Sequence, residues 1–389
     1  MEKKKILFYV SGIGLGGVEK VILEVLKGID KEKYDIKLGL NNENENFFEN
    51  EIPKEINYQY MVNRKIIEKT LMYKKRKNIL NKLFYSYMLW YEKYIAKKNF
   101  LKFAEDRDIL IDFKSGDYLR LINLFKDKKK MVWLHGELSD LVKYKKNKKN
   151  FEKNLRKCNR IILISQIMKE LFVKKVPELA KRTELIYNPF DFESIRKKST
   201  DLSEEDNKSI EMLNSNYFLM VSRIDFQSKD FETLLKAFKI FSKDNREYNL
   251  FLLGDGSKKD MKILELKIRE YNLEKRVILL GVRKNPYPWI KNAEILIQSS
   301  RYEGLPTVLI EGLILDKKII ATDCPTGPRE ILENGKIGKL IKIGDYISMA
   351  QNMKKVLEEE NKKDYKESIE RFEKDRILKK IESLIDNLL

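Results

Sequence analysis

The stretch ILFYVSGIGLGGVEKVILEVLKGIDKEKYDIKLGL, residues 6–40, contains a short apolar run, a glycine-rich loop, a helical pattern and a second apolar run. In the helical part, apolar residues recur with the three- and four-residue spacing of one helix face: Val18, Val21, Ile22, Val25, Leu26 and Ile29. A strand, a loop, a helix and another strand in this order predict a parallel βαβ unit.

Short apolar runs typical of buried strands continue through the chain. In the first half they lie at 109–113, 131–134 and 161–164, and in the second half at 217–221, 250–253, 277–280, 295–298, 319–321 and 339–343. Their alternation with helical segments predicts an α/β protein with two Rossmann-like, doubly wound parallel sheets. Such a pair of domains places a ligand in the cleft between them, beyond the carboxyl ends of the strands.

The predicted domains have the following boundaries. Residues 1–193 form the N-terminal domain, 194–216 a polar linker, 217–365 the C-terminal domain, and 366–389 a helix that packs back on the N-terminal domain. A chain of 389 residues with 42% hydrophobic residues has enough apolar material for two such cores.

Few residues of this chain are suited to metal binding or to disulfide formation. The sequence has two cysteines, Cys158 and Cys324, and one histidine, His135. A disulfide framework or a Cys/His metal site is therefore not expected, and a reducing cytoplasm fits. No stretch reaches the roughly 18 apolar residues of a membrane-spanning helix, and the N-terminal apolar run is too short for a signal peptide.

The net charge of +19 is concentrated near the N-terminus. Residues 64–102 contain 12 Lys/Arg and 2 Glu, and residues 126–150 contain 9 Lys and 3 acidic residues. The first stretch also carries aromatic residues at helical spacing and predicts one or two basic amphipathic helices that contact an anionic membrane surface. The alternative is an ordinary core-facing helix with a solvated lysine face. No nucleic-acid-binding module is present, so nucleic acid is not an expected partner.

The glycine loop also matches the dinucleotide-binding pattern, through Gly12, Gly14 and Gly17. That pattern requires an acidic residue at the end of the second strand to hold a ribose. Here the strand is followed by Asn41 and Asn42. Binding of NAD or FAD is therefore the weaker interpretation of this loop.

The segment SSRYEGLPTVLIEG, residues 299–312, follows one predicted strand and opens a helix. Glu303 would lie in the loop, and Glu311 two turns along the helix. The amides near Gly304 would form a free helix N-terminus, which suits phosphate, while the carboxylates suit sugar hydroxyls. The plainer alternative makes Glu303 a helix cap and Glu311 a solvated charge.

This segment resembles the Glu-x7-Glu motif of glycosyltransferase family 4, a family of retaining enzymes with the GT-B fold. Five further segments resemble that family's elements in the same order: 16–20, 186–189, 221–231, 254–256 and 323–331. Ser222 and the Thr326-Gly327-Pro328 sequence depart from the family's usual glycines. These departures leave the donor sugar open.

The resemblance implies a role for each matching residue. Arg223 and Lys229 would bind the donor diphosphate, Glu303 hydroxyls of the transferred sugar, and Glu311 the ribose. His135 would lie near the sugar and the acceptor, so the implied catalytic set is His135, Glu303, Arg223 and Lys229. The implied donor-binding set is Gly16, Gly17, Arg223, Lys229, Gly254, Glu303, Gly304, Leu305, Pro306, Thr307, Val308 and Glu311. No metal or cofactor is implied, and no general base is assigned.

The resemblance implies transfer of a hexose or N-acetylhexosamine from a UDP-sugar to a glycan or polyprenyl-linked acceptor. The expected location is cytoplasmic, on the inner face of the cell membrane. The alternatives are a same-fold sugar-nucleotide enzyme such as an epimerase or phosphorylase, or an inactive glycan-assembly scaffold.

Overall fold

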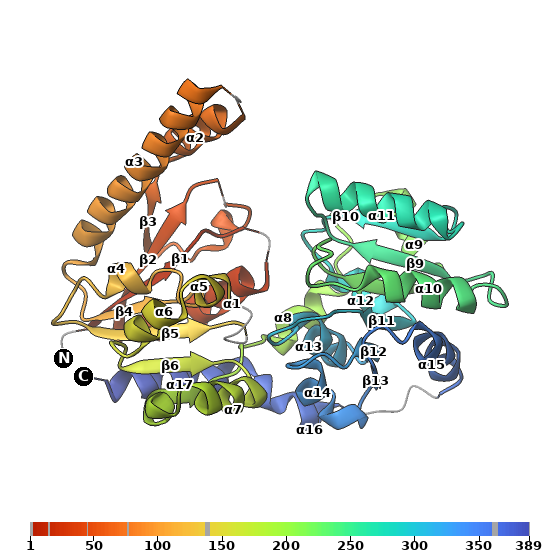
Figure 1. The fold of residues 1–389 in the computed structure, drawn as a ribbon. Helices are drawn as coiled ribbons and strands as arrows, with labels where there is room; N and C mark the ends of the chain where they lie inside the picture. Colours follow the sequence, from red (N-terminus) through yellow and green to blue (C-terminus); the bar gives the residue numbers. More distant parts are fainter. Residues whose placement is uncertain are drawn as a thin grey trace. The chain divides into compact units, whose positions relative to one another are not determined.

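The computed structural model describes residues 3–14, 16–44, 46–75, 78–136, 141–359 and 365–388. The chain divides into two compact units (Figure 1). The first comprises residues 1–190 and 374–389, and the second comprises residues 191–373. Each unit is built on one parallel sheet.

The first sheet has the strand order β3-β2-β1-β4-β5-β6-β7, with every neighbouring pair parallel. Its strands are β1 (Lys4–Val10), β2 (Tyr34–Asn42), β3 (Asn57–Val62), β4 (Ile109–Asp112), β5 (Lys129–Leu134), β6 (Arg160–Leu163) and β7 (Thr183–Leu185). The central strands are almost wholly buried because helices cover a parallel sheet on both faces, which explains their continuous apolar runs.

The helices of the first unit follow the strands in the order expected of crossover connections. They are α1 (Gly17–Gly28), α2 (Arg64–Lys75), α3 (Ile79–Ala104), α4 (Leu119–Ile122), α5 (Val142–Lys146), α6 (Lys148–Leu155), α7 (Gln166–Lys175) and, from the end of the chain, α17 (Lys374–Asp386). The predicted βαβ unit at residues 6–40 is confirmed as β1-α1-β2.

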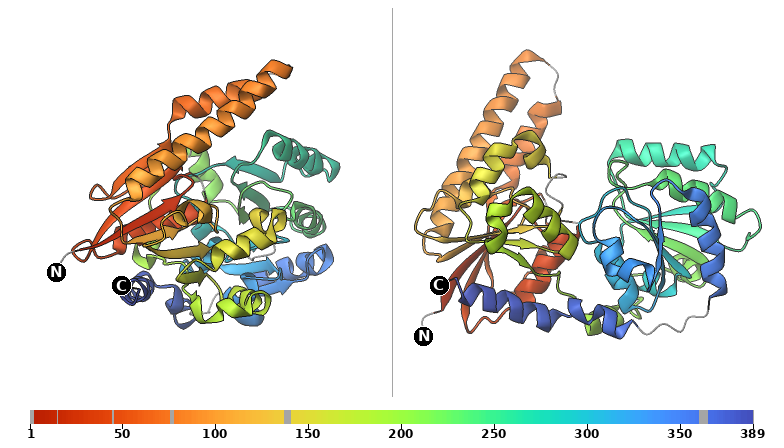
Figure 2. Two further views of the ribbon diagram at one scale, coloured as in Figure 1. Left: turned by 60° about the vertical axis from the view of Figure 1, so that its left-hand side comes forward. Right: turned by 60° about the horizontal axis from the view of Figure 1, so that its bottom comes forward.

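The C-terminal helix α17 lies against the first unit, as two views show (Figure 2). A Cβ atom on Gly28 of α1 would meet Leu378 Cδ1 at 2.2 Å, so the glycine allows close helix packing. Asp386 accepts hydrogen bonds from Lys4 Nζ at 3.0 Å and from the Tyr34 hydroxyl at 2.8 Å. These contacts join the two ends of the chain.

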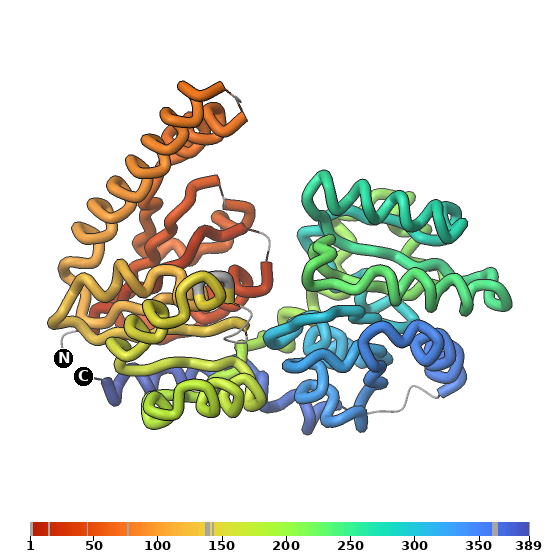
Figure 3. Tube along the Cα trace, viewed as in Figure 1, coloured from red at the N-terminus to blue at the C-terminus, as the bar shows by residue number. Residues whose placement is uncertain are grey.

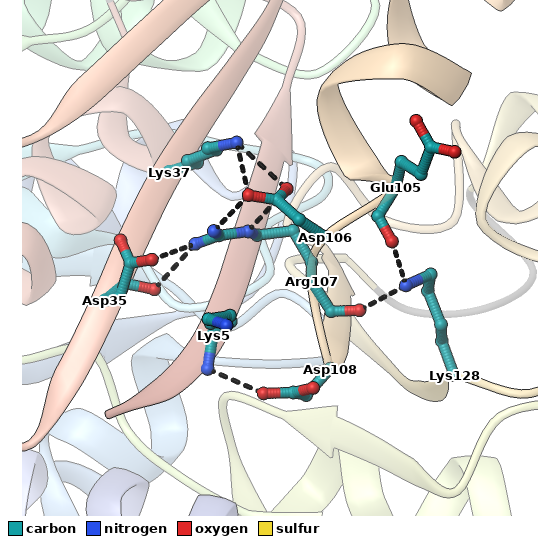
Figure 4. A network of polar contacts seen from close by, with 8 residues as sticks. All are labelled: Lys5, Asp35, Lys37, Glu105, Asp106, Arg107, Asp108 and Lys128. Atoms are coloured by element: carbon teal, nitrogen blue, oxygen red, sulfur yellow. Dashed lines mark hydrogen bonds and ion pairs between the residues drawn. The ribbon is translucent and has the colours of Figure 1, made fainter. Parts of the chain in front are cut away.

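A polar network ties together the amino ends of β1, β2 and β4 (Figure 4). Arg107, whose side chain is 2% exposed, contacts the Asp106 carboxylate at 2.6 Å and the Asp35 carboxylate at 2.8 Å. Lys37 adds a second cation to Asp106, and these two partners hold the pKa of Asp106 well below its usual value despite partial burial. Ligands of parallel α/β sheets bind at the carboxyl ends of the strands, whereas this network lies at the amino ends. Its role is therefore structural.

The second sheet has the order β10-β9-β8-β11-β12-β13, again all parallel. Its strands are β8 (Tyr217–Val221), β9 (Asn249–Leu253), β10 (Val277–Gly281), β11 (Ile295–Gln298), β12 (Lys318–Thr322) and β13 (Lys339–Ile341). The helices are α8 (Phe192–Lys198), α9 (Asn207–Leu213), α10 (Phe231–Phe241), α11 (Lys258–Glu270), α12 (Tyr287–Asn292), α13 (Thr307–Ile314), α14 (Pro328–Ile331), α15 (Tyr346–Glu358) and α16 (Lys366–Ile369).

The structure differs from the sequence-based expectation in three places. Residues 366–373, predicted as part of the returning C-terminal helix, belong to the second unit, and α17 begins at Lys374. Strands β3 and β7, which lie at the two edges of the first sheet, were not predicted. The region predicted as a linker, 194–216, instead contains α8 and α9, whose Ile195 and Leu213 are buried. It belongs to the second unit, which begins at residue 191.

Candidate functional site

The predicted site residues fall into two groups, one in each unit, and each group lies at the carboxyl edge of its own sheet. In the second unit, the loop after β8 runs between the loops after β9 and β11. Ile224 pairs with Gly256, and Lys229 pairs with Ser300. Three neighbouring strands, β9, β8 and β11, therefore bring their following loops together. This is the edge where α/β sheets bind ligands.

Two glycines allow the loops after β8 and β9 to approach closely. A Cβ atom on Gly254 would lie 1.9 Å from the Ser222 carbonyl oxygen, and one on Gly256 would lie 2.1 Å from that of Ile224. Gly254 also has a φ of +142°, which side-chain-bearing residues rarely adopt. Arg223 lies between these two contacts, and its side chain is exposed.

Glu303 is held by three donors on one carboxylate oxygen. Oε1 accepts hydrogen bonds from Lys229 Nζ, from Gln298 Nε2 at 2.7 Å and from Ser300 Oγ at 2.6 Å. The Lys229 and Glu303 side chains are 12% and 13% exposed. In the part of the chain that the structure describes, no side chain donates to Oε2. One oxygen is thus anchored, and the other is left for a ligand hydroxyl.

Glu303 is ionised at neutral pH. Burial raises the pKa of its carboxyl group, but the charge of Lys229 and the three hydrogen bonds outweigh burial, so the pKa is lowered overall. An ionised carboxylate only accepts hydrogen bonds, and sugar hydroxyls are suitable donors to it.

The helix α13 begins directly after the Glu303 loop. No side chain caps its N-terminus within the described region, so its first amides and its positive dipole end are left for an anion. Leu305, Pro306 and Val308 are buried, so these residues would offer only backbone to a ligand. Glu311 lies in the second turn of α13 and is also buried, with 5% of its surface exposed.

Several residues that hold this site together were missed by sequence reasoning. Gln298 and Ser300 hold the Glu303 side chain, and Thr326 donates from its hydroxyl to the Glu303 carbonyl oxygen. Thr322 Oγ1 accepts from the Ser300 amide at 2.7 Å. Asp230 caps α10 through the Thr233 amide. Asp230, Ser300 and Thr326 lie inside the motif segments and Gln298 and Thr322 directly beside them, and that position was their only signal in the sequence.

In the first unit, the predicted residues follow two strands, β1 and β5, that flank β4 in the sheet. Gly16 and Gly17 lie at the start of α1 after β1, and His135 follows β5. Between them, Lys114 follows β4 and forms an ion pair of 2.6 Å with Glu19 of α1. The His135 amide donates to Ser115 Oγ at 2.9 Å. Lys114 and Glu19 therefore add a partly buried charge pair to this edge, at the point where the strand order reverses.

The imidazole of His135 is neutral at physiological pH. Burial and, to a smaller extent, the charge of Lys114 lower its pKa to about 3, although a hydrogen bond with the Phe113 carbonyl opposes both effects. Within the described residues, its buried Nε2 atom has no hydrogen-bond partner. A neutral imidazole carries one N–H, and here that hydrogen is donated to the Phe113 carbonyl, so Nε2 is able to accept one hydrogen bond from a ligand.

We expect His135 to resist protonation and to lower stability in acid. Between about pH 3 and 6.5, the unfolded chain binds a proton at this imidazole and the folded chain does not. Stability should then fall with decreasing pH by up to about 1.4 kcal/mol per pH unit. Because the chain has one histidine, NMR reads its titration directly. His135→Gln should remove this part of the slope, and an imidazole that titrates near pH 6.5 would contradict the assignment.

Gln298→Leu should weaken the sugar-donor binding that the family resemblance implies for Glu303, without unfolding the protein. The substitution keeps a buried side chain but removes one hydrogen bond from an ionised carboxylate, an interaction worth about 1.5–3 kcal/mol. We expect kcat/KM for the donor to fall about 10- to 100-fold. Gln351→Leu, at an exposed position of α15, is the matched control. Equal activity in both variants would show that Gln298 does not position Glu303.

The described residues show neither a cluster suited to a metal ion nor a membrane-spanning helix. No group of three or more His, Cys, Asp or Glu side chains is arranged to hold a metal ion. No helix in the described part of the chain combines the length and apolarity needed to cross a membrane.

Residues 202–377 match the model of the family described as Glycosyl transferases group 1. The matched region contains Arg223, Lys229, Glu303 and Glu311. The chain is similar to this family over these 176 of its 389 residues.

Two curated relatives match over a similar length. An uncharacterized glycosyltransferase of Methanocaldococcus jannaschii is 34% identical over 172 residues, covering 44% of this chain and 41% of the relative. The N-acetylgalactosamine-N,N'-diacetylbacillosaminyl-diphospho-undecaprenol 4-alpha-N-acetylgalactosaminyltransferase of Campylobacter jejuni is 34% identical over 188 residues, covering 48% of this chain and 47% of the relative. The aligned regions span less than half of each relative's length.

Among solved structures, Anabaena HepE in complex with UDP-glucose has a TM-score of 0.78. It is 18% identical and covers 99% of this chain and 100% of its own. At this identity the likeness establishes the fold. The chain has the GT-B fold, with two parallel α/β sheets, as the sequence predicted.

Proposed function

We propose that this protein is a retaining glycosyltransferase. It moves a hexose or N-acetylhexosamine from a UDP-sugar to a hydroxyl of a glycan or lipid-linked acceptor in the synthesis of a surface polysaccharide or glycolipid. The observation that carries the proposal is the Glu303 carboxylate, anchored through one oxygen beside Lys229 and the uncapped N-terminus of α13.

The second unit would bind the donor. Lys229 and Arg223 supply positive charge for the diphosphate, and the first amides of α13 supply hydrogen-bond donors. A leaving diphosphate gains negative charge in the transition state, so fixed cations lower the barrier without a metal ion. Glu303 would accept hydrogen bonds from hydroxyls of the transferred sugar, and Glu311 would hold the ribose. Gly254 keeps the Arg223 loop in place.

The first unit would bind the acceptor. His135 offers a neutral imidazole at the carboxyl edge of its sheet, and Gly16 and Gly17 form a loop without side chains at the same edge. No side chain is assigned as nucleophile or general base. The donor phosphate itself is a suitable acceptor for the proton of the attacking hydroxyl.

The relatives support the choice of donor and acceptor. The Campylobacter relative is named for transfer of N-acetylgalactosamine to a diphospho-undecaprenol substrate, and the Anabaena structure holds UDP-glucose. A lipid-linked acceptor is presented at a membrane surface. We therefore infer that the protein works in the cytoplasm as a peripheral protein on the inner face of the cell membrane.

A transfer assay tests the proposal. The protein is incubated with UDP-hexoses and UDP-N-acetylhexosamines and with lipid-linked and short soluble acceptors, with EDTA present. We expect a glycoside product with the anomeric configuration of the donor, as determined by NMR. Conversion of the donor sugar without transfer would instead identify an epimerase. Inverted configuration, or complete dependence on a metal ion, would contradict the proposed mechanism.

A further inference from the structure

The helices α2 and α3 form a hairpin that extends away from the sheet of the first unit (Figures 1 and 3). The C-terminal half of α3 packs inward through Ala96, Phe100 and Phe103, and Asn99 Nδ2 donates to the Met61 carbonyl of β3 at 2.8 Å. The N-terminal half packs mainly on α2 and reaches beyond the sheet. Such an extension contributes little to the core, so its exposed residues call for another explanation.

The extended half of α3 exposes a continuous apolar face. We define the outer face of α3 by its large exposed side chains, which are between 51% and 77% exposed: Ile79, Leu80, Leu83, Phe84, Tyr87, Trp90 and Tyr94. The steps from 79 through 83, 87 and 90 to 94 are those of one helix face. Of the 18 exposed large hydrophobic residues in the described part of the chain, 7 lie on this face. Contiguous apolar surface of this kind marks an interaction site.

Three aromatic residues of the outer face, Tyr87, Trp90 and Tyr94, lie together in one row, and the fourth, Phe84, stacks on Tyr73 of α2. The Tyr87 and Trp90 rings are 6.0 Å apart, and Trp90 stacks on Tyr94 at 5.8 Å. Tyr and Trp side chains combine an apolar ring with a polar atom, and they favour the boundary between lipid headgroups and acyl chains.

Uncompensated positive charge surrounds the outer face. Lys82, Lys93, Lys97 and Lys98 are exposed, and none forms an ion pair with any residue that the structure describes. Residues 64–102 carry 12 Lys/Arg against 2 Glu, a net charge of +10. A second copy of this chain is disfavoured as the partner of this face, because it would bring two segments of net charge +10 together. Anionic lipid headgroups complement the charge and accept the apolar residues as well.

We propose that the outer face of α3 inserts into the headgroup–acyl boundary of an anionic bilayer and that the α2–α3 hairpin anchors the enzyme there. This deepens the proposed function and rests on it for the lipid-linked acceptor. The proposal names the helix face that enters the lipid. The basic composition of the segment alone does not identify that face. If apolar side chains insert into the lipid, part of the vesicle binding should persist at high salt. Binding through charge alone should be lost at high salt, because salt screens the charges.

Trp90 makes insertion directly measurable. The chain has three tryptophans, and Trp133 and Trp289 are fully buried. On addition of phosphatidylglycerol/phosphatidylethanolamine vesicles to the full-length protein, we expect a blue shift of the emission and quenching by lipids brominated near the headgroup end of the acyl chain. Neither should occur with Trp90→Phe or with vesicles of phosphatidylcholine alone.

The double variant Leu83→Glu/Trp90→Glu should reduce co-sedimentation with these vesicles at least tenfold. Ile240→Glu, at an exposed position of α10 in the second unit, is the matched control and should bind like the wild type. Transfer to a soluble acceptor should be unchanged in both variants.

If vesicle binding survives in the double variant, or if Trp90 is not quenched, the insertion proposal is wrong. A blue shift that depends on protein concentration without vesicles would indicate self-association instead and would also overturn it. Vesicle binding without any sugar transfer would overturn the proposed function alone.

Discussion

Lys229→Ala is expected to lower kcat/KM for sugar transfer by about 100- to 1,000-fold. Lys229 Nζ donates to the Glu303 carboxylate, and both side chains are largely buried. The substitution removes a fixed cation from the position assigned to the diphosphate. It also leaves a buried carboxylate without its counter-charge, so the pKa of Glu303 should rise toward the value favoured by burial. Both effects reduce turnover.

Two controls separate these effects from a loss of folding. Lys236→Ala removes an exposed lysine of α10 that pairs with Glu232, and it should leave activity unchanged. Glu303→Gln keeps the side-chain shape but loses the negative charge, and it should also reduce turnover about 100-fold or more. Melting temperatures of all variants show whether the second unit stays folded. Full turnover in both Lys229→Ala and Glu303→Gln would show that the site is elsewhere.

Gly254→Ala is expected to destabilise the second unit by about 3 kcal/mol. The added Cβ would lie 1.9 Å from the Ser222 carbonyl oxygen, so the backbone of one loop must shift. Since the β8 loop carries Arg223 and leads to Lys229, that shift should also weaken binding of the diphosphate. A lower unfolding midpoint in urea, together with weaker nucleotide binding, is the expected result.

Gly281→Ala is the matched control for this prediction. Gly281 ends β10, its carbonyl accepts from the Gly254 amide at 2.8 Å, and its φ is +67°. A Cβ atom there meets no atom within 4 Å, so the alanine costs only the backbone strain of about 1 kcal/mol. If the two variants were equally stable, the close approach of the β8 and β9 loops would not matter for stability.

The sequence predicts the central strands of both sheets because these are buried on both faces and therefore read as continuous apolar runs. It misses β3 and β7, which lie at sheet edges. The first three residues of β3, Asn57, Tyr58 and Gln59, are exposed, and β7 has only 3 residues. It also misses the helices α8 and α9, because each buries few residues and the surrounding sequence is polar.

The site was predictable only in part. Glu303 and Lys229 were identified from motifs that resemble a family, and the structure brings them into direct contact although they are 74 residues apart. The convergence of Gln298 and Ser300 on the same carboxylate oxygen was not predictable. It depends on how the chain turns after β11, and neither residue type indicates it alone. The ion pair of Lys114 with Glu19 was not predictable for the same reason. It joins the segment after β4 to the helix after β1, and these meet only in the folded sheet.

The central claim is that the carboxyl edge of the second sheet binds a nucleoside diphosphate sugar without a metal ion. The most direct measurement is a thermal-shift titration of the full chain with UDP, GDP, ADP and NAD in EDTA. A ligand at 100 times its Kd stabilises the native state by about 2.7 kcal/mol. UDP should raise the melting temperature of the wild type, and Lys229→Ala should lose most of this shift. Stabilisation by NAD with no response to any nucleoside diphosphate would contradict a nucleotide-sugar site at the second sheet and would favour the glycine loop of the first unit as a dinucleotide site.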